Sequence, residues 1–216
     1  MLLKIGMLLD GEFPPDLRVE NEMRTLASSG FDVHLLCYDF SGVKSKTEKF
    51  DQNITIHRIQ VSQQFHKKFN PLALTLPFYF SFWEKKAHNF INELDIDIIH
   101  IHDLRLAEVG HRIKKNFNIP YVLDLHENLP AGLSVYAFSN SFFGKMIVSI
   151  KRWERYEQKQ VDNADAVITV IEEMSQRINS LGVAENKIFT VPNYISLNFF
   201  DSGKIKAALE RKPGEI

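Results

Sequence analysis

The sequence predicts an α/β fold built on a doubly wound, mostly parallel sheet, Rossmann-like in its alternation of elements. Short apolar runs rich in β-branched residues alternate with stretches whose apolar residues recur at helical spacing, which is typical of a parallel sheet covered by helices. One segment, Asp95–Asn128, has the pattern of a complete βαβ unit. Polar residues follow both of its strands, at the sheet edge where open parallel sheets bind ligands.

The first half of the chain divides into three strands and one helix. The expected strands are Leu2–Leu9, Val33–Tyr38 and Ile54–Ile59. Asp10–Pro15 is expected to form the loop after the first strand, Asp16 to cap the following helix, and Gly30 to end it. The polar, lysine-rich segment that runs on to Asn53 is expected to be a loop or a frayed edge.

The second half continues the alternation. A long helical stretch is expected over Leu72–Leu94, which Pro77 either starts or kinks. The strands of the βαβ unit are Ile98–Ile101 and Tyr121–Leu125, and the helix between them carries apolar residues at Leu106, Val109, Ile113 and Phe117. The elements expected after it are a mixed stretch over Leu129–Ser141, a helix from Phe142 to about Val161, a strand over Ala166–Val170, a helix over Ile171–Leu181 and a strand over Ile188–Val191.

The composition excludes several classes of protein. The chain has 216 residues, which suits one α/β domain, and a net charge of −1, which gives no field for recruiting nucleic acid. A single cysteine, Cys37, excludes an intramolecular disulfide and is typical of a reducing compartment. The longest uncharged run, Phe69–Trp83, is too short to span a bilayer and contains two prolines. We expect a cytoplasmic protein with at most peripheral contact to the inner face of the membrane.

The ends of the two βαβ strands carry the candidate site residues. His102 and Asp103 follow the first strand, and Asp124, His126 and Glu127 end the second. Because strands joined by a βαβ crossover are usually neighbours, these side chains are expected at one edge of the sheet. The alternative is that each histidine only caps its strand. A metal site is a third interpretation, with His100 as a further ligand. The apolar strand around His100 favours its burial instead, and we expect no metal.

Other motifs fail on position or are missing. Asp95-Ile96-Asp97 resembles a metal-binding DxD, but it precedes its strand and is interpreted as a connection. No GxGxxG follows the first strand, and there is no P-loop and no GxSxG elbow. The remaining histidines are expected on edges or helix surfaces without a functional role: His34, His57, His66, His88 and His111.

Five segments together resemble family-4 glycosyltransferases. FPPDLRVENEMRTLASSGFDVHLLCYD resembles the start of that family, and DIDIIHIHD its fourth-strand segment. IPYVLDLHENLP resembles the segment that carries the histidine of the active-site cleft. ADAVITVIEEMSQRI and NKIFTVPNYI resemble the late strand, helix and "PN" element before the domain hinge. The resemblance extends from Leu2 to about Phe200.

The resemblance implies a GT-B enzyme with two Rossmann-like domains and the reaction in the cleft between them. Such an enzyme transfers a sugar from a nucleotide-sugar donor to a glycan or lipid-linked acceptor, as in cell-surface polysaccharide synthesis, with retention of configuration and without a metal. Residues 1–200 would form the acceptor-side domain, and residues 201–216 a linker toward a carboxyl-terminal donor-binding domain. The 216-residue chain alone would then be inactive. The alternative is a non-catalytic module that binds an acceptor or a partner.

The resemblance also assigns roles to single residues. His126 corresponds to the catalytic histidine, Gly11 to the loop near the donor phosphates, and Asn193 to the "PN" element. Asp10 and Glu12 flank Gly11 and disfavour phosphate there, and Tyr194 replaces the usual glycine. Arg18 is placed to meet an anionic acceptor group, with an i,i+4 pair to Glu22 as its alternative. The other acceptor-side candidates are His102, Asp103, Asp124 and Glu127, and Asp124 and Glu127 are expected to orient or charge His126.

Two stretches combine aromatic and basic residues, Phe65–Lys86 and Phe142–Lys159. Such faces suit docking on an anionic membrane leaflet. The alternative, which we favour, is that the aromatic residues pack onto the sheet.

Overall fold

The computed structural model describes residues 2–76, 78–135 and 149–194. Its eight-stranded sheet has the order β3-β4-β2-β1-β5-β6-β7-β8. The strands are β1 (Lys4–Glu12), β2 (Asp32–Asp39), β3 (Thr47–Asp51), β4 (Ile54–Gln60), β5 (Ile98–His102), β6 (Tyr121–Leu125), β7 (Ala166–Thr169) and β8 (Ile188–Thr190). All neighbouring strands are parallel except β3 and β4. The predicted α/β class with a mostly parallel sheet is therefore confirmed.

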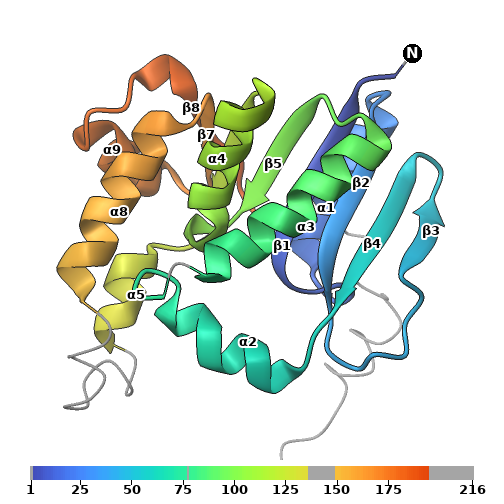
Figure 1. Cartoon of the computed structure of the whole chain (residues 1–216). Coiled ribbons are helices and arrows are strands. Elements are labelled where there is room, and N and C mark those ends of the chain that lie inside the picture. The colour runs from blue at the N-terminus through green and yellow to red at the C-terminus, as the bar shows by residue number, and fades with distance from the viewer. Residues whose placement is uncertain (1, 77, 136–148, 195–216) are drawn as a thin grey trace, which may run out of the picture.

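Helices cover both faces of this sheet (Figure 1). The helices are α1 (Leu17–Ser28), α2 (Gln63–Phe69), α3 (Phe78–Leu94), α4 (Ala107–Phe117), α5 (Leu129–Val135), α8 (Ile150–Asn163) and α9 (Glu172–Ser180), with short 3-10 turns at η1 (Asn70–Leu72), η2 (Leu104–Leu106) and η3 (Glu185–Lys187). On one face, Val19 and Met23 of α1 pack on β1, β2 and β4. On the other, buried residues of α3, α4 and α8 form the larger core.

The local signals for α1 act as predicted. The Asp16 side chain accepts hydrogen bonds from the backbone N–H groups of Arg18 and Val19, as a helix N-cap does. At the other end Gly30 has φ of +91°, a conformation that costs glycine little. The helix therefore begins and ends where the sequence places it, and it holds its polar residues in fixed positions over β1.

The first strand is longer than predicted. Asp10, Gly11 and Glu12 belong to β1 rather than to a loop, because Glu12 pairs with Tyr38 of β2 after a shift in register. The Glu12 carboxylate also accepts a hydrogen bond from the Phe40 N–H, at 2.9 Å. The loop after β1 consequently starts at Phe13.

Three further expectations need correction. The lysine-rich segment before Asn53 contains β3, an edge strand whose antiparallel pairing to β4 is a non-local contact. The helix expected from Leu72 begins only at Phe78, and Ser62 caps the separate short helix α2 before it. Leu129–Val135, expected as mixed structure, is helical. Pro77 and Phe142–Val148 lie outside the described residues, so the helix expected from Phe142 is described from Ile150.

One histidine expected on an edge or surface, His34, is buried, and it contacts the half-buried His57. His34 of β2 is 8% exposed, and its Nδ1 lies 3.2 Å from Nε2 of His57 on β4. The His57 ring contacts Phe90 of α3, edge to face. The prediction was wrong because β2 is covered by helices on both faces, so even its polar residues are enclosed. His57 is buried enough that its pKa falls to about 4, which keeps the pair uncharged near neutral pH.

The amino-end position of Asp95-Ile96-Asp97 is confirmed. The Asp97 carboxylate accepts a hydrogen bond from the Lys4 backbone N–H at 2.8 Å, where β1 begins. The segment thus ties the start of β5 to the start of β1, at the edge opposite the candidate site.

The two stretches that combine aromatic and basic residues contribute to the core. Phe80, Trp83 and Trp153 are buried there, as the favoured alternative predicts.

Candidate active site

The candidate site lies where β5 and β6 end side by side. His102 and Asp124 are register partners in the parallel pair, which brings the two predicted strand ends together. The Asp103 N–H donates a hydrogen bond to the Asp124 carbonyl at 2.8 Å. Asp103 itself has φ of +68°, a costly backbone conformation for a residue with a side chain. Such strain is found mainly where a function depends on it.

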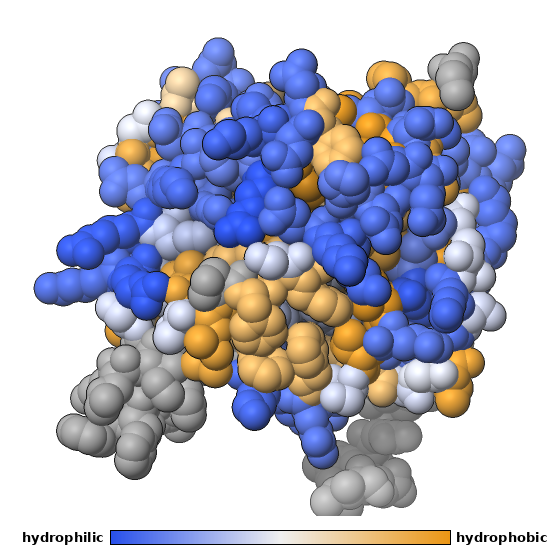
Figure 2. Space-filling view, in the orientation of Figure 1, coloured by the Kyte–Doolittle hydropathy of each residue, from blue (hydrophilic) through white to orange (hydrophobic). Residues whose placement is uncertain are grey.

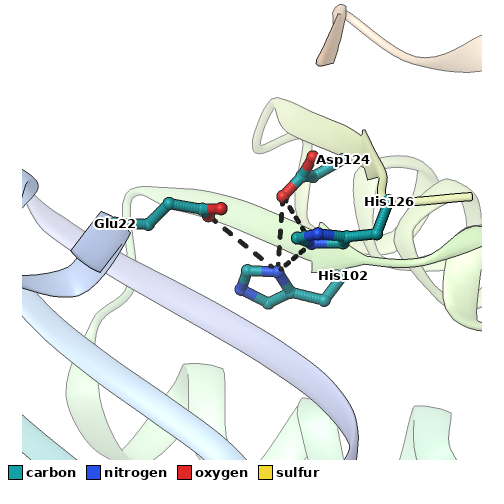
Figure 3. A group of neighbouring side chains, drawn as sticks. All are labelled: Glu22, His102, Asp124 and His126. Atoms are coloured by element: carbon teal, nitrogen blue, oxygen red, sulfur yellow. Dashed lines mark hydrogen bonds and ion pairs between the residues drawn. The ribbon is translucent and has the colours of Figure 1, made fainter. Parts of the chain in front are cut away.

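Four side chains converge at this edge (Figure 3). His126 Nε2 lies 2.8 Å from Asp124 Oδ2 and 3.2 Å from His102 Nδ1. His102 Nδ1 is also 3.4 Å from Asp124 Oδ2. Glu22 reaches in from α1, with its Oε2 3.9 Å from His102 Nδ1. We call Glu22, His102, Asp124 and His126 the strand-end cluster.

His100 extends the cluster along β5. Its ring stacks on that of His102, with centroids 4.6 Å apart, because both side chains leave the same face of the strand. His100 Nε2 lies 3.4 Å from both Asp124 Oδ2 and Glu22 Oε2. At 6% exposure His100 is buried, as its apolar strand predicts.

The electrostatics of the cluster centre on Asp124. Burial alone would raise the pKa of this carboxyl, but hydrogen bonds from His100, His102 and His126 hold it far below its usual range. Glu22 behaves in the opposite way. Burial and the charge of Asp124 raise its pKa to about 7. The carboxylate of Asp124 is therefore the fixed negative charge of the site.

The two histidines differ in the same field. Burial lowers the pKa of His102 to about 4, against the opposing effect of its hydrogen bond to Asp124. Burial also disfavours the charged form of His126, but its hydrogen bond to Asp124 and the Asp124 charge outweigh burial and raise its pKa. His126 is thus the imidazole of the cluster that most readily holds a proton.

Arg18 brings a positive charge to the same region. Its guanidinium pairs with Asp16 at 3.1 Å and not with Glu22, so the alternative i,i+4 pair is wrong. Burial lowers the pKa of Arg18, but the bond to Asp16 and the charges of Asp103 and Asp124 raise it overall. The side chain remains 41% exposed and free to meet a ligand on its outer side.

A pocket of about 710 Å³ opens beside the cluster, on the sheet face that α1 covers only in part. Its polar lining includes Arg18, Asn21, Glu22, His100, Asn193 and Tyr194. The Asn21 side-chain amide donates a hydrogen bond to the Tyr194 carbonyl at 2.8 Å and so joins α1 to the segment after β8. The structure therefore brings two predicted site residues, Arg18 and Asn193, to one pocket. Glu22 of the strand-end cluster and the adjoining His100 line the same pocket.

Of the predicted site residues, only Arg18 and Asn193 line this pocket. His102, Asp103, Asp124 and His126 lie at the neighbouring strand ends, and Gly11 and Glu127 join neither group. Gly11 lies in β1, where an added Cβ would meet only the Leu9 side chain, at 3.8 Å or more. Glu127 was expected to orient or charge His126, but its side chain is 44% exposed and lies 4.0 Å from Arg105. Asp124 alone fulfils that expectation.

Glu22 is the site residue that the sequence analysis missed as a member of the cluster. It follows Val19 by three residues and precedes Met23, both buried on the sheet-facing side of α1. An acidic residue on the apolar stripe of a helix is a signal of a buried polar partner. Here the partners come from β5 and β6.

The strand-end cluster is also the group that could hold a metal. One donor atom from each member lies within 4.8 Å of all the others. Two imidazole nitrogens and two carboxylate oxygens form a donor set that zinc accepts.

In the described part of the chain, no helix is long and apolar enough to cross a bilayer.

The sequence of the chain matches the model of a known protein family. The model of the family described as Glycosyltransferase Family 4 matches residues 18–199. No curated protein sequence matches the chain.

Three solved structures illustrate the likeness in fold. Sucrose-phosphate synthase from Thermosynechococcus elongatus superposes with a TM-score of 0.72 at 15% identity, over 99% of this chain and 54% of its own. The catalytic domain of starch synthase IV from Arabidopsis thaliana, bound to ADP and acarbose, gives 0.62 at 12% identity, over 100% and 60%. Arabidopsis thaliana UGT89C1, complexed with UDP, gives 0.58 at 10% identity, over 100% and 56%. The chain thus spans little more than half the length of these structures.

Proposed function

Since the chain belongs to glycosyltransferase family 4, we propose that it forms the acceptor-side domain of a GT-B glycosyltransferase. The complete enzyme would move a sugar from a nucleotide-sugar donor to a glycan or lipid-linked acceptor, in polysaccharide synthesis. The observation that carries this proposal is the Asp124–His126 pair, which lies at the end of β6 next to the pocket lined by Arg18 and Asn193.

His126 would act on the donor through its free ring nitrogen. When Nε2–H donates to Asp124 at 2.8 Å, Nδ1 is left buried and has no hydrogen bond within the described residues. Asp124 fixes the orientation of the ring and favours the imidazolium, whose charge offsets that of a leaving phosphate. Nδ1–H would donate to the donor sugar or its phosphate, and configuration would be retained. The transfer itself would need no metal.

The donor would be a nucleoside diphosphate sugar held largely by a second, carboxyl-terminal domain. Two of the matched structures contain ADP or UDP, which supports this class of donor for the present chain. Residues 1–200 would supply the acceptor side, with Arg18 at the pocket to pair with an anionic group of the acceptor. Asn193 would mark the pocket wall nearest the second domain.

A direct test compares the 216-residue chain with the protein expressed from the complete reading frame. We expect the short chain to unfold cooperatively but to release no nucleotide from UDP-, GDP- or ADP-sugars, because the residues that hold the donor lie in the second domain. The full-length protein should release nucleotide when an acceptor-containing membrane or glycan extract is added. Turnover by the short chain would contradict the division of labour. A full-length protein without turnover on any donor would favour a non-catalytic binding module.

Membrane contact is a separate part of the proposal. Figure 2 shows an apolar area on the face that carries α2 and the start of α3, bordered by hydrophilic residues. Around the start of α3, Leu76 and Phe78 are 39% and 41% exposed, and Lys67 and Lys68 of α2 are exposed as well. Each basic residue near an anionic leaflet adds about 1 kcal/mol of attraction. A lipid-linked acceptor would be met at this surface.

Phe80, Trp83 and Trp153 pack in the core, but Leu76 and Phe78 stay exposed, so we expect the protein to float with liposomes rich in anionic lipid and not with neutral liposomes. Leu76→Ser combined with Phe78→Ser should abolish flotation, since both apolar contacts are lost. Val43→Ser is the matched control, because Val43 is 85% exposed far along the chain from this area. Failure of the unchanged protein to float with either lipid would leave only the packing role of these aromatic residues.

A further inference from the structure

The strand-end cluster combines side chains from three separate elements around one point. Glu22 comes from α1, His102 ends β5, and Asp124 and His126 come from β6 and the turn after it (Figure 3). Except for Glu22, which is 21% exposed, their side chains are at most 2% exposed. The site is therefore enclosed and held by the sheet itself.

The distances between the donor atoms match those around a tetrahedral metal ion. With zinc bonds of about 2.0–2.2 Å, neighbouring ligand atoms stand about 3.3 Å apart. The three separations among His102 Nδ1, Asp124 Oδ2 and His126 Nε2 are 2.8, 3.2 and 3.4 Å. Glu22 Oε2 stands slightly farther out, at 3.9 Å from His102 Nδ1. Its partly exposed side chain has the torsional freedom to close that gap.

Hydrogen bonds among the four residues leave this arrangement unsatisfied. If His126 Nε2–H donates to Asp124, that nitrogen has no lone pair for His102 Nδ1, which lies only 3.2 Å away. Glu22 Oε2, the carboxylate atom that faces the cluster, is buried and has no hydrogen bond within the described residues. Buried polar atoms are normally paired, so the Glu22 carboxylate lacks a ligand on the side that faces the cluster.

The charges of the four residues also favour a divalent cation as the ligand. Two carboxylates face two imidazoles in a largely buried site, and a divalent cation neutralises both acids while it binds both ring nitrogens. Nitrogen donors favour zinc over magnesium or calcium, which prefer oxygen ligands in larger number. We propose that Glu22, His102, Asp124 and His126 together bind one zinc ion.

This inference goes beyond the proposed function, and zinc is not a cofactor of sugar transfer. Because a His126 Nε2 bound to zinc has no proton to donate to Asp124, the zinc-bound state would block the role proposed for His126. The inference departs from the expectation, drawn from the sequence, that the site holds no metal. The ion would join α1 to the ends of β5 and β6 and thereby stabilise the fold at the cleft edge. Binding to the folded state alone raises the melting temperature.

The test is a titration of the metal-free 216-residue chain with Zn²⁺ and, separately, with Mg²⁺. We expect one Zn²⁺ per chain with a Kd below about 1 µM, a rise in melting temperature, and no response to Mg²⁺. Co²⁺ in place of Zn²⁺ should give the strong visible absorption of a tetrahedral nitrogen–oxygen site. Glu22→Gln, a near-isosteric change on the partly exposed α1, should weaken Zn²⁺ binding at least about tenfold, and His102→Gln at least about a hundredfold.

His88→Gln is the matched control, since it removes an exposed histidine of α3 and leaves the cluster whole. Its Zn²⁺ affinity and stoichiometry should equal those of the unchanged chain. Equal affinity in the Glu22→Gln chain would overturn the proposal, as would failure of the unchanged chain to bind Zn²⁺ at tens of micromolar. If the His102→Gln chain misfolds, the Glu22→Gln chain still tests zinc binding, because this near-isosteric change should leave the fold intact.

Discussion

Replacing Arg177 by Met is expected to lower the free energy of unfolding by about 3–5 kcal/mol. Arg177 of α9 holds the Glu157 carboxylate of α8 in two parallel hydrogen bonds, at 2.7 and 2.8 Å. The Glu157 side chain is only 2% exposed. Removing the guanidinium therefore leaves a buried carboxylate without its charge partner, which costs far more than the loss of a surface pair. Urea unfolding at neutral pH, followed by circular dichroism, measures the change.

Two matched variants separate this effect from a general loss of an arginine. Arg24→Met removes a guanidinium that pairs with Glu20 and Asp51 on the surface, where 45% of the Arg24 side chain is exposed. Its cost should stay within about 1 kcal/mol. The double change Glu157→Leu with Arg177→Met should recover most of the stability, because no buried charge remains. If Arg177→Met costs no more than Arg24→Met, the buried pair does not stabilise the contact between α8 and α9.

The fold was predictable because its signals are local. Apolar β-branched runs define β5 and β6, Asp16 and Gly30 bound α1, and the crossover rule makes β5 and β6 neighbours. β3 was not predictable to the same degree. Its exposed, charged sequence carries no apolar alternation, and only the pairing with β4 makes it a strand. The burial of His34 was missed for a similar reason, since helices cover both faces of the sheet at β2.

The site was predictable in part. His102, Asp124 and His126 follow from strand ends and from the period of two along a strand. Glu22 does not, because its position depends on how α1 lies across the carboxyl edge, which no local pattern specifies. Glu127 was misjudged because it is next to His126 in sequence. In the structure adjacent residues at that turn point in different directions, and of the two acids Asp124 and Glu127 only Asp124 reaches the ring.

His126→Ala in the complete two-domain protein is expected to lower turnover about a hundredfold or more, by analogy with the loss of one preorganised donor. The imidazole would lose both its Nδ1 contact to the donor and the charge that Asp124 favours on it. The fold should survive, because β6 and its pairing with β5 and β7 do not depend on that ring. Turnover per folded molecule and melting temperature must be measured on the same sample, in the presence of a chelator so that bound zinc does not contribute.

His88→Ala serves as the control for removing a histidine, since His88 is exposed on α3 and hydrogen-bonds only locally, to Asn92. It should leave turnover unchanged. The opposite pattern for His126→Ala, a lower melting temperature with turnover per folded molecule intact, would mean that His126 only completes the buried network with Asp124 and His102. A folded His126→Ala enzyme whose turnover stays within a few-fold of the unchanged enzyme would end the catalytic assignment and leave His126 as a ligand of the strand-end cluster.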